Sequence, residues 1–190
     1  MPLELITYGD PVLRVRATPV ARITPDFKRL VDGMMETMYA NSGVGLAAQQ
    51  VGQTVSVCVI DIPPDMDVAG EGGPRLHPDL TMPLVMFNPQ IIRRAKALER
   101  CDEGCLSFPG IHTGVQRATE LTVGFVDWRG ESRTLDCRGL LARAVQHELD
   151  HLSGVLLVDR MSPVKKISLA GVLKRLREET EAKRAAPRQV

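Results

Sequence analysis

The sequence has few cysteines, no long apolar runs and almost no net charge, and each shortage excludes a class of protein. Four scattered cysteines among 190 residues are too few for a disulfide scaffold, so we interpret them as reduced thiols. No apolar run approaches the roughly 20 residues that span a bilayer. The first residues carry neither a basic region nor an apolar core, so no signal peptide is expected. A cytoplasmic protein without membrane association is therefore predicted.

The charge balance excludes a strongly basic or acidic protein. Lysine and arginine number 24 against 23 acidic residues, which leaves a formal charge of +1. Bulk binding to nucleic acid is not implied, although a local basic patch is still compatible with this balance. Apolar residues at 44% and charged residues at 25% are ordinary for a globular protein. We expect a single domain over residues 1–190 without internal repeats.

Hydrophobic periodicity divides the chain into helices near both ends and short strands between them. Apolar residues recur at helical spacing over residues 25–39, and helix formers fill residues 139–152. A final helix is predicted over about 164–184. This order predicts an α+β fold with mainly antiparallel sheets around a central helix, followed by a C-terminal helix. The expected strands are 54–61, 84–92, 95–101, 120–127 and 132–137, with a hairpin turn at 127–130.

Residues 62–83 differ in composition from the rest of the chain. They contain five prolines and three glycines. Long connections with this composition usually run over the surface and are mobile. We interpret the segment as an inserted loop without chemistry.

The stretch 146–151 reads QHELDH and contains the pattern H-E-x-x-H. The preceding residues favour helix, so the pattern is expected on the central helix. Residues four apart lie on one helix face, so His147 and His151 can bind one metal ion. Glu148 is offset by one position and can reach a water on that metal without being a ligand. A chance pair of histidines beside a surface glutamate is the alternative.

A third ligand is needed to complete such a site. One class of zinc protease continues as H-E-x-x-H-x-x-G-x-x-H, but this chain has Leu157 at the last position. A second class uses a downstream glutamate, and Glu178, Glu179 and Glu181 look like residues of a solvated helix face. Cys105, in the stretch EGCLS, is the better candidate, because a thiolate with two imidazoles leaves a fourth position open for catalysis.

Two other uses of Cys105 are possible. Cys101 lies four residues earlier, so both thiols could bind a structural ion, although such a site gives Glu148 no role. Cys105 could also be a nucleophile with His147 as its base.

Residues 43–50 read GVGLAAQQ and form a third unusual stretch. They match the weak dinucleotide fingerprint G-x-G-x-x-A, but a predicted helix rather than a strand precedes them. The stretch is better interpreted as a glycine-rich loop whose backbone can approach a ligand closely. Gln50 at its end carries a neutral amide that can donate to a developing oxyanion.

The stretches GVGLAAQQ, EGCLS and QHELDH, in this order, resemble the three signature motifs of the peptide deformylase family. The start YGDPVLR and the region after QHELDHLSG are also similar to bacterial members. The likeness covers nearly the whole chain and is weakest over residues 62–83. The resemblance implies a metal-dependent hydrolase that removes the formyl group from formyl-methionyl nascent peptides and releases formate.

The resemblance also implies roles for individual residues. Glu148 is the implied general base and acid, and the backbone N–H of Leu106 joins the Gln50 amide at the oxyanion. The implied metal ligands are Cys105, His147 and His151. The implied metal in the cell is Fe(2+), and Ni(2+), Co(2+) or Zn(2+) suit the same ligands.

Substrate contacts are implied at the backbone of Val44, Gly45 and Leu106 and at Gly110. The methionine side chain needs an apolar pocket, for which Val44, Leu140 and Ala144 are the candidates. Arg143, one helical turn before His147, is expected either at the mouth of the site or simply on the surface.

The final helix is rich in lysine and arginine, and two interpretations apply to this charge. It forms a solvated face, or, as the resemblance to bacterial members implies, it contacts ribosomal RNA. Two other functions compete with the leading one. A zinc endopeptidase would leave EGCLS and Gln50 without a role, and a non-catalytic metal-binding or ribosome-associated module would not need Glu148.

Overall fold

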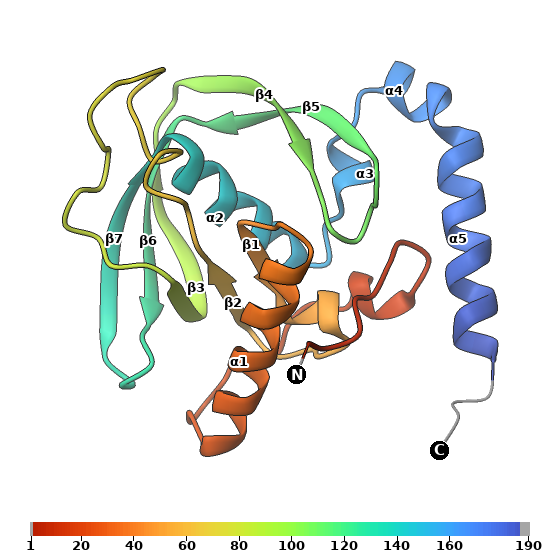
Figure 1. Ribbon diagram of the computed structural model, residues 1–190, viewed down its shortest axis with the longest axis horizontal. Coiled ribbons are helices and arrows are strands. Elements are labelled where there is room, and N and C mark those ends of the chain that lie inside the picture. The colour runs from red at the N-terminus through yellow and green to blue at the C-terminus, as the bar shows by residue number, and fades with distance from the viewer. Residues whose placement is uncertain (1, 187–190) are drawn as a thin grey trace.

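The computed structural model describes residues 2–186, so Met1 and residues 187–190 of the predicted 1–190 domain lie outside the described residues. The chain is built around helix α2 (Gly139–Leu152), which passes between a larger and a smaller antiparallel sheet (Figure 1). The α+β prediction, with mainly antiparallel sheets, a central helix and a C-terminal helix, is confirmed.

The larger sheet has five antiparallel strands in the order β1-β2-β3-β6-β7, so β1 lies at one edge. The smaller sheet pairs β4 with β5. The predicted hairpin at 127–130 is confirmed, since Asp127 N–H donates to Glu131 O at 2.9 Å. The strands are β1 (Gly45–Ala47), β2 (Val57–Ile60), β3 (Leu84–Arg94), β4 (Leu98–Gly104), β5 (His112–Ala118), β6 (Glu120–Val126) and β7 (Ser132–Arg138).

Two strands were not predicted. β1 lies within the stretch interpreted as a glycine-rich loop, and its three residues are too short to show a period of two. β5 contains Gly114 and Arg117, which weaken a strand pattern, and it forms because every residue of β4 finds a partner on it.

The helices confirm two predictions and correct a third. α1 (Pro25–Ala40) and α2 lie where periodicity placed them. The single final helix predicted over 164–184 is wrong, because the structure has α4 (Pro163–Ser168) and α5 (Ala170–Ala185), which meet at Leu169. Leu169 and Leu173 both pack onto the cluster around Tyr8 and Phe108, so tertiary packing decides this change of direction. The remaining helix is α3 (Leu157–Arg160), and Pro11–Arg14 and Ala48–Val51 form 3-10 turns.

Helix α2 is held by its apolar face. Leu141 and Val145 are fully buried against strands of the larger sheet. Burying one such side chain contributes roughly 1.5–3 kcal/mol. Because this face is anchored, the neighbouring positions of α2, which carry the H-E-x-x-H residues, are held in a constant position.

The segment 62–83, which was predicted as an inserted loop without chemistry, has an internal structure that its composition does not show. Asp67 and His77 within it are buried, and Val68 pairs with Arg75 in an isolated antiparallel bridge. Its composition predicted turns correctly, but composition carries no information about the two buried polar side chains that organise it.

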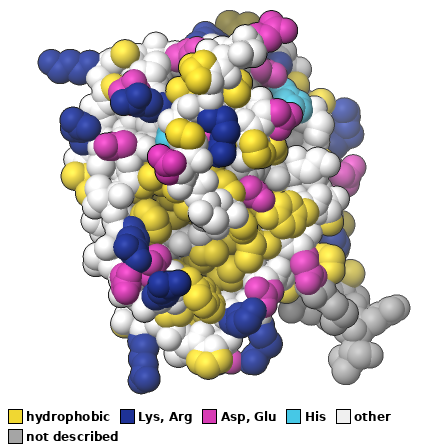
Figure 2. Space-filling model, turned by 60° about the vertical axis from the view of Figure 1, so that its left-hand side comes forward, with side chains coloured by type: hydrophobic (Ala, Val, Ile, Leu, Met, Phe, Trp, Pro, Cys, Tyr) yellow, Lys and Arg dark blue, Asp and Glu magenta, His cyan; other side chains and the backbone are white. Residues whose placement is uncertain are grey.

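The surface carries apolar as well as charged side chains. Figure 2 shows hydrophobic side chains gathered in a band across one face, with charged side chains around it. Among residues 2–186, no helix combines the length and the apolar character that crossing a membrane requires.

Candidate metal centre

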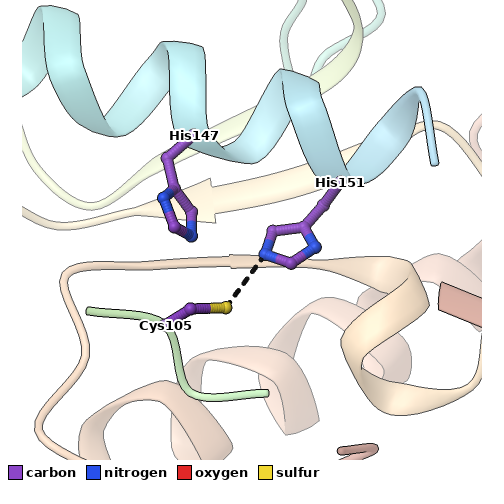
Figure 3. A group of neighbouring side chains, drawn as sticks. All are labelled: Cys105, His147 and His151. Carbon is purple, nitrogen blue, oxygen red and sulfur yellow. Dashed lines mark hydrogen bonds between the residues drawn. The ribbon is translucent and has the colours of Figure 1, made fainter. Parts of the chain in front are cut away.

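Two histidines of α2 and one cysteine converge on a single point (Figure 3). His147 and His151 lie one turn apart, and both imidazoles point from the helix towards Cys105 on the segment after β4. Cys105 Sγ lies 3.2 Å from His151 Nε2, and one ligand atom from each of the three residues lies within 4.8 Å of the others. The third ligand chosen from sequence is therefore the one that the fold brings to the histidines.

Glu103 orients His147 from behind. His147 Nδ1 donates to Glu103 Oε2 at 3.1 Å, which leaves Nε2 free to face Cys105. Burial opposes ionisation of Glu103, but hydrogen bonds from His147 and Arg117 outweigh it and lower its pKa to about 2. Burial lowers the pKa of His151 well below its usual value, so this imidazole is neutral and offers a lone pair.

A buried ion network supports Glu103 in turn. Arg117 donates to both carboxylate oxygens at 3.0 and 2.9 Å, and Arg143 donates to one of them at 2.8 Å. Arg117 also donates to Asp150, which is held on its other side by Arg160 at the surface. Buried charges persist only where partners compensate them, so these charges rigidify the wall behind His147.

Glu148 lies at the bottom of the site and is 3% exposed. Burial raises its pKa to about 7, which is the range suited to moving protons near neutral pH. Its Oε2 has no hydrogen-bond partner among residues 2–186, although it is buried. Gly45 lies directly against it, since a Cβ there would meet Glu148 Cδ at 3.0 Å. One oxygen of the Glu148 carboxylate therefore has no hydrogen-bond partner among the described residues, and the contact with Gly45 leaves the group little room to move.

Gln50 is held with its amide nitrogen towards the thiol. Its Oε1 accepts from Ala47 N–H at 2.9 Å, so the other end of the amide must donate. Nε2 lies 3.7 Å from Cys105 Sγ and 3.3 Å from Ser107 Oγ. This geometry leaves Nε2 as the donor end of the amide, as the role predicted for Gln50 requires.

The donor set fits a divalent ion. A thiolate and two neutral imidazoles are the ligands of three-protein-ligand catalytic sites, which leave one position for water or substrate. The buried and unpaired oxygen of Glu148 beside them is costly without a polar partner there. A closed structural site with Cys101 is disfavoured, because Cys101 does not join the cluster that Cys105 forms with the histidines.

A pocket of about 570 Å³ opens over this centre. Its walls come from the segment 41–45, from the chain between β4 and β5, and from the exposed side of α2. Every site residue predicted from sequence lines it except His151, which is 1% exposed beneath it. The predicted residues in the lining are Val44, Gly45, Gln50, Cys105, Leu106, Gly110, Leu140, Ala144, His147 and Glu148.

Arg143 also lines the pocket, but its guanidinium is turned into the ion network and donates to Val115 O as well as to Glu103. It is therefore neither a free surface residue nor a free cation at the mouth. Sequence reasoning assigned no role to Glu103 or Ser107. Both belong to the unusual stretch around Cys105, which was the only local signal for them. The contact of Glu103 with His147 and that of Ser107 with Gln50 cannot be predicted from sequence spacing.

The chain is similar to proteins of one family throughout its length. The family model for polypeptide deformylase matches residues 2–167. The peptide deformylase of Opitutus terrae is 40% identical over 185 residues, which cover 96% of both chains. That of Nitrosococcus oceani is 43% identical over 164 residues, covering 86% of this chain and 89% of the relative.

Solved structures of the same family have the same fold. Peptide deformylase 1B of Arabidopsis thaliana, in complex with an inhibitor, has a TM-score of 0.82 at 37% identity and covers 97% of this chain and 96% of its own. The Synechococcus elongatus peptide deformylase, in complex with actinonin, has a TM-score of 0.78 at 40% identity, with 90% and 88% covered.

Proposed function

Because this chain belongs to the peptide deformylase family, it removes the formyl group from the N-terminal formyl-methionine of new polypeptides, and we propose the residues that perform this reaction. Cys105, His147 and His151 hold the divalent ion on which this family depends. Glu148 is the general base and acid. The observation that carries the proposal is the buried Glu148 carboxylate, with one oxygen unpaired, beside a converging thiol and two imidazoles.

A divalent ion held by Cys105, His147 and His151 would supply Lewis acidity, lowering the pKa of a water from about 15.7 to about 7 and making it a nucleophile at neutral pH. Glu148 takes the proton that this water loses and returns it to the amine that leaves. Its raised pKa serves both transfers, since a carboxylate of ordinary pKa would be a poor acid at neutral pH. The products are formate and a free N-terminal amine.

The charge that develops on the formyl oxygen needs donors. Gln50 Nε2 is directed towards this region by the bond that its Oε1 accepts from Ala47. The N–H of Leu106, next to Cys105, is the second proposed donor. Removing one such donor typically lowers the rate by about 100- to 1,000-fold.

The peptide part of the substrate is proposed to pair with β1. This strand lies at the edge of its sheet, and Gly45 on it lines the pocket. Edge strands offer unpaired backbone groups that can bind an extended peptide. Val44, Leu140 and Ala144 then surround the methionine side chain, and Gly110 lines the same pocket.

Formate release distinguishes this function from the alternatives. Purified protein given a formyl-methionyl peptide should release formate, and a chelator should abolish the release until a divalent ion is restored. A zinc endopeptidase would instead cleave internal bonds of an unformylated peptide. Absence of formate, or release that a chelator leaves unchanged, would overturn the proposed function.

The resident ion in the cell is proposed to be Fe(2+), with Ni(2+), Co(2+) or Zn(2+) able to replace it. The support is the mixed thiolate and imidazole set, which suits all four ions. Metal analysis of protein purified without oxygen should find iron in stoichiometric amount. Zinc in the anaerobic preparation would contradict the assignment.

The base assignment predicts a specific mutant phenotype. Glu148→Ala should retain the metal, because Glu148 is not a ligand, and should lose activity by roughly 100- to 10,000-fold. Metal content and formate release are measured on the same preparation. Near-normal turnover in the metal-loaded variant would contradict the role given to Glu148.

Cytoplasmic location, and contact between the C-terminal region and the ribosome, are also proposed. Lys166, Arg175 and Arg184 are exposed on α4 and α5. Arg177 is partly used within the molecule, since it donates to the Tyr8 hydroxyl at 2.6 Å.

Charge reversal tests the ribosome contact better than truncation, because Leu173 of α5 is buried in the core. Replacing Lys166, Arg175 and Arg184 with glutamate should weaken co-sedimentation with ribosomes, most at low salt. The matched control replaces three exposed cations outside α4 and α5 with glutamate, namely Arg22, Lys96 and Arg129. Equal co-sedimentation of both variants and the parent would exclude this contact.

A further inference from the structure

The segment 62–83 contains a buried acid–histidine pair that the reaction does not use. Asp67 is 2% exposed and His77 is 9% exposed. Asp67 Oδ1 lies 2.6 Å from His77 Nδ1, and its Oδ2 accepts from His77 N–H at 3.1 Å and from Arg75 at 3.4 Å. Three donors from one short stretch thus converge on a single carboxylate, which closes the segment into a compact unit.

The far side of His77 contacts the start of the catalytic helix. The backbone N–H of Arg138 donates to His77 Nε2 at 3.2 Å. Since a backbone N–H can only donate, Nε2 must be the accepting nitrogen, and Nδ1 therefore carries the proton that Asp67 accepts. The contacts assign one tautomer to His77 and leave neither ring nitrogen without a partner.

The junction between β7 and α2 is also held from β6, where Glu120 lies opposite Arg138 in the ladder and 3.7 Å from its side chain. Arg138 is the N-cap of α2, and its side chain makes no capping hydrogen bond. Gly139 follows with φ +53°, and a Cβ at that position would meet Leu76 Cδ1 at 2.7 Å. The side chain before His77 thus packs on the glycine that allows the turn, so the segment contacts two consecutive residues at this junction.

We infer that His77, oriented by Asp67, is a positioning residue for the pocket that holds the methionine side chain. Leu140 follows the anchored Arg138 by two residues, and Ala144 follows Leu140 by one helical turn; both line the pocket. Leu80 and Met82 of the same segment pack on the core cluster that also contacts Leu140. The Asp67–His77 pair therefore determines the position of the pocket wall that Leu140 and Ala144 form. His147 and Glu148 lie farther along the same helix.

Two substitutions separate the two contacts of His77. His77→Gln places an amide oxygen near the position of Nε2 and can still accept from Arg138. His77→Asn keeps a donor near the position of Nδ1 for Asp67 but loses the acceptor. Asp79→Asn, an exposed acid of the same segment, is the control.

The inference rests on the proposed function, and the assay is formate release from formyl-methionyl and formyl-alanyl peptides by the metal-loaded full chain. His77→Asn should raise KM for the methionyl peptide by about three- to tenfold, with kcat within about twofold of the parent, since one hydrogen bond is lost outside the reacting centre. The preference for methionine over alanine should shrink by a similar factor. His77→Gln should restore both values, and Asp79→Asn should match the parent.

Hydrogen exchange at the Arg138 amide gives a second readout that does not depend on activity. It should be slow in the parent and in His77→Gln, and faster in His77→Asn. Fast exchange in the parent, or a parent-like KM and preference in folded His77→Asn, would overturn the inference. An inactive parent protein would instead refute the proposed function. The exchange experiment would still test the hydrogen bond between Arg138 N–H and His77.

Discussion

At the scale of single residues, the site depends on a missing side chain, that of Gly45, as well as on the side chains that are present. Gly45 has no side chain, and this absence leaves space for the Glu148 carboxylate. Glu148 can then remain buried, with burial raising its pKa to about 7 and with Oε2 unpaired among the described residues. A glycine usually reflects backbone freedom, but here the close approach of another side chain explains it.

Gly45→Ala should therefore impair catalysis by displacing the base. The added Cβ would lie 3.0 Å from Glu148 Cδ and closer still to Oε1, so the carboxylate must move. We expect kcat to fall by at least about 100-fold with metal content unchanged, because a misplaced base loses its contribution to proton transfer.

The matched control is Gly171→Ala on α5, where the nearest atom to a new Cβ is at 3.9 Å. It should leave both kcat and the melting temperature close to the parent. Full activity in Gly45→Ala would show that Glu148 can move without loss of function. The close contact with Gly45 would then be unimportant for catalysis.

At the scale of elements, β4 and α2 are held together by one carboxylate. Glu103 on β4 binds His147 and Arg143 of α2 and also Arg117 of β5. Cys105 follows Glu103 by two residues, so this contact sets the distance between the thiol and the two imidazoles. Both strands of the smaller sheet and helix α2 meet through this single residue.

Glu103→Gln should loosen both the fold and the metal site. Removing the charge leaves Arg117 and Arg143 short of a partner, which costs about 3–5 kcal/mol of unfolding free energy in buried networks. Metal affinity should fall by roughly 10- to 100-fold, since His147 loses its orienting acceptor.

Denaturant unfolding and competitive chelation measure the two effects. Glu99→Gln on the same strand is the control, because Glu99 is 61% exposed and pairs with Arg143 only at 3.5 Å. Its substitution should cost less than about 1 kcal/mol. Equal effects of both substitutions would refute the bracing role of Glu103.

At the scale of the whole molecule, one small site joins distant parts of the chain. Gln50, Cys105 and His147 come from an edge strand region, a connection between two strands and a helix. The N-terminal arm also contributes, since Ile6 N–H donates to Gln50 O and Tyr8 N–H donates to Ser107 O. An ion held at this point therefore stabilises contacts across the entire fold.

Metal removal should for this reason lower the stability of the whole chain. An ion present at about 100 times its dissociation constant adds about 2.7 kcal/mol, and for a chain of this size that corresponds to a melting temperature higher by roughly 5–10 °C. Calorimetry with and without chelator measures the shift. Cys105→Ala, which lacks one ligand, should melt at nearly the same temperature under both conditions; a chelator effect of equal size in that variant would exclude Cys105 as a ligand.

The sequence by itself determined what depends on local periodicity. The spacing of His147 and His151 places both imidazoles on one face, because a helix repeats every 3.6 residues whatever surrounds it. The same periodicity located α1 and α2 and offset Glu148 from the two histidines, which is why it is proposed as a base rather than a ligand. Cys105 and Gln50 could be chosen by chemistry, since few other residues could complete the ligand set or donate to an oxyanion.

Only the tertiary structure decided which distant groups meet. The QHELDH pattern contains no information about Glu103 behind His147, about Gly45 against Glu148, or about the His77 contact at the start of α2. Residues 62–83 were predicted as a loop without chemistry, because a proline- and glycine-rich composition reports turns and not buried contacts. Such pairings arise from the packing of segments far apart in the chain, where each contact depends on the position of the others, so local patterns cannot specify them.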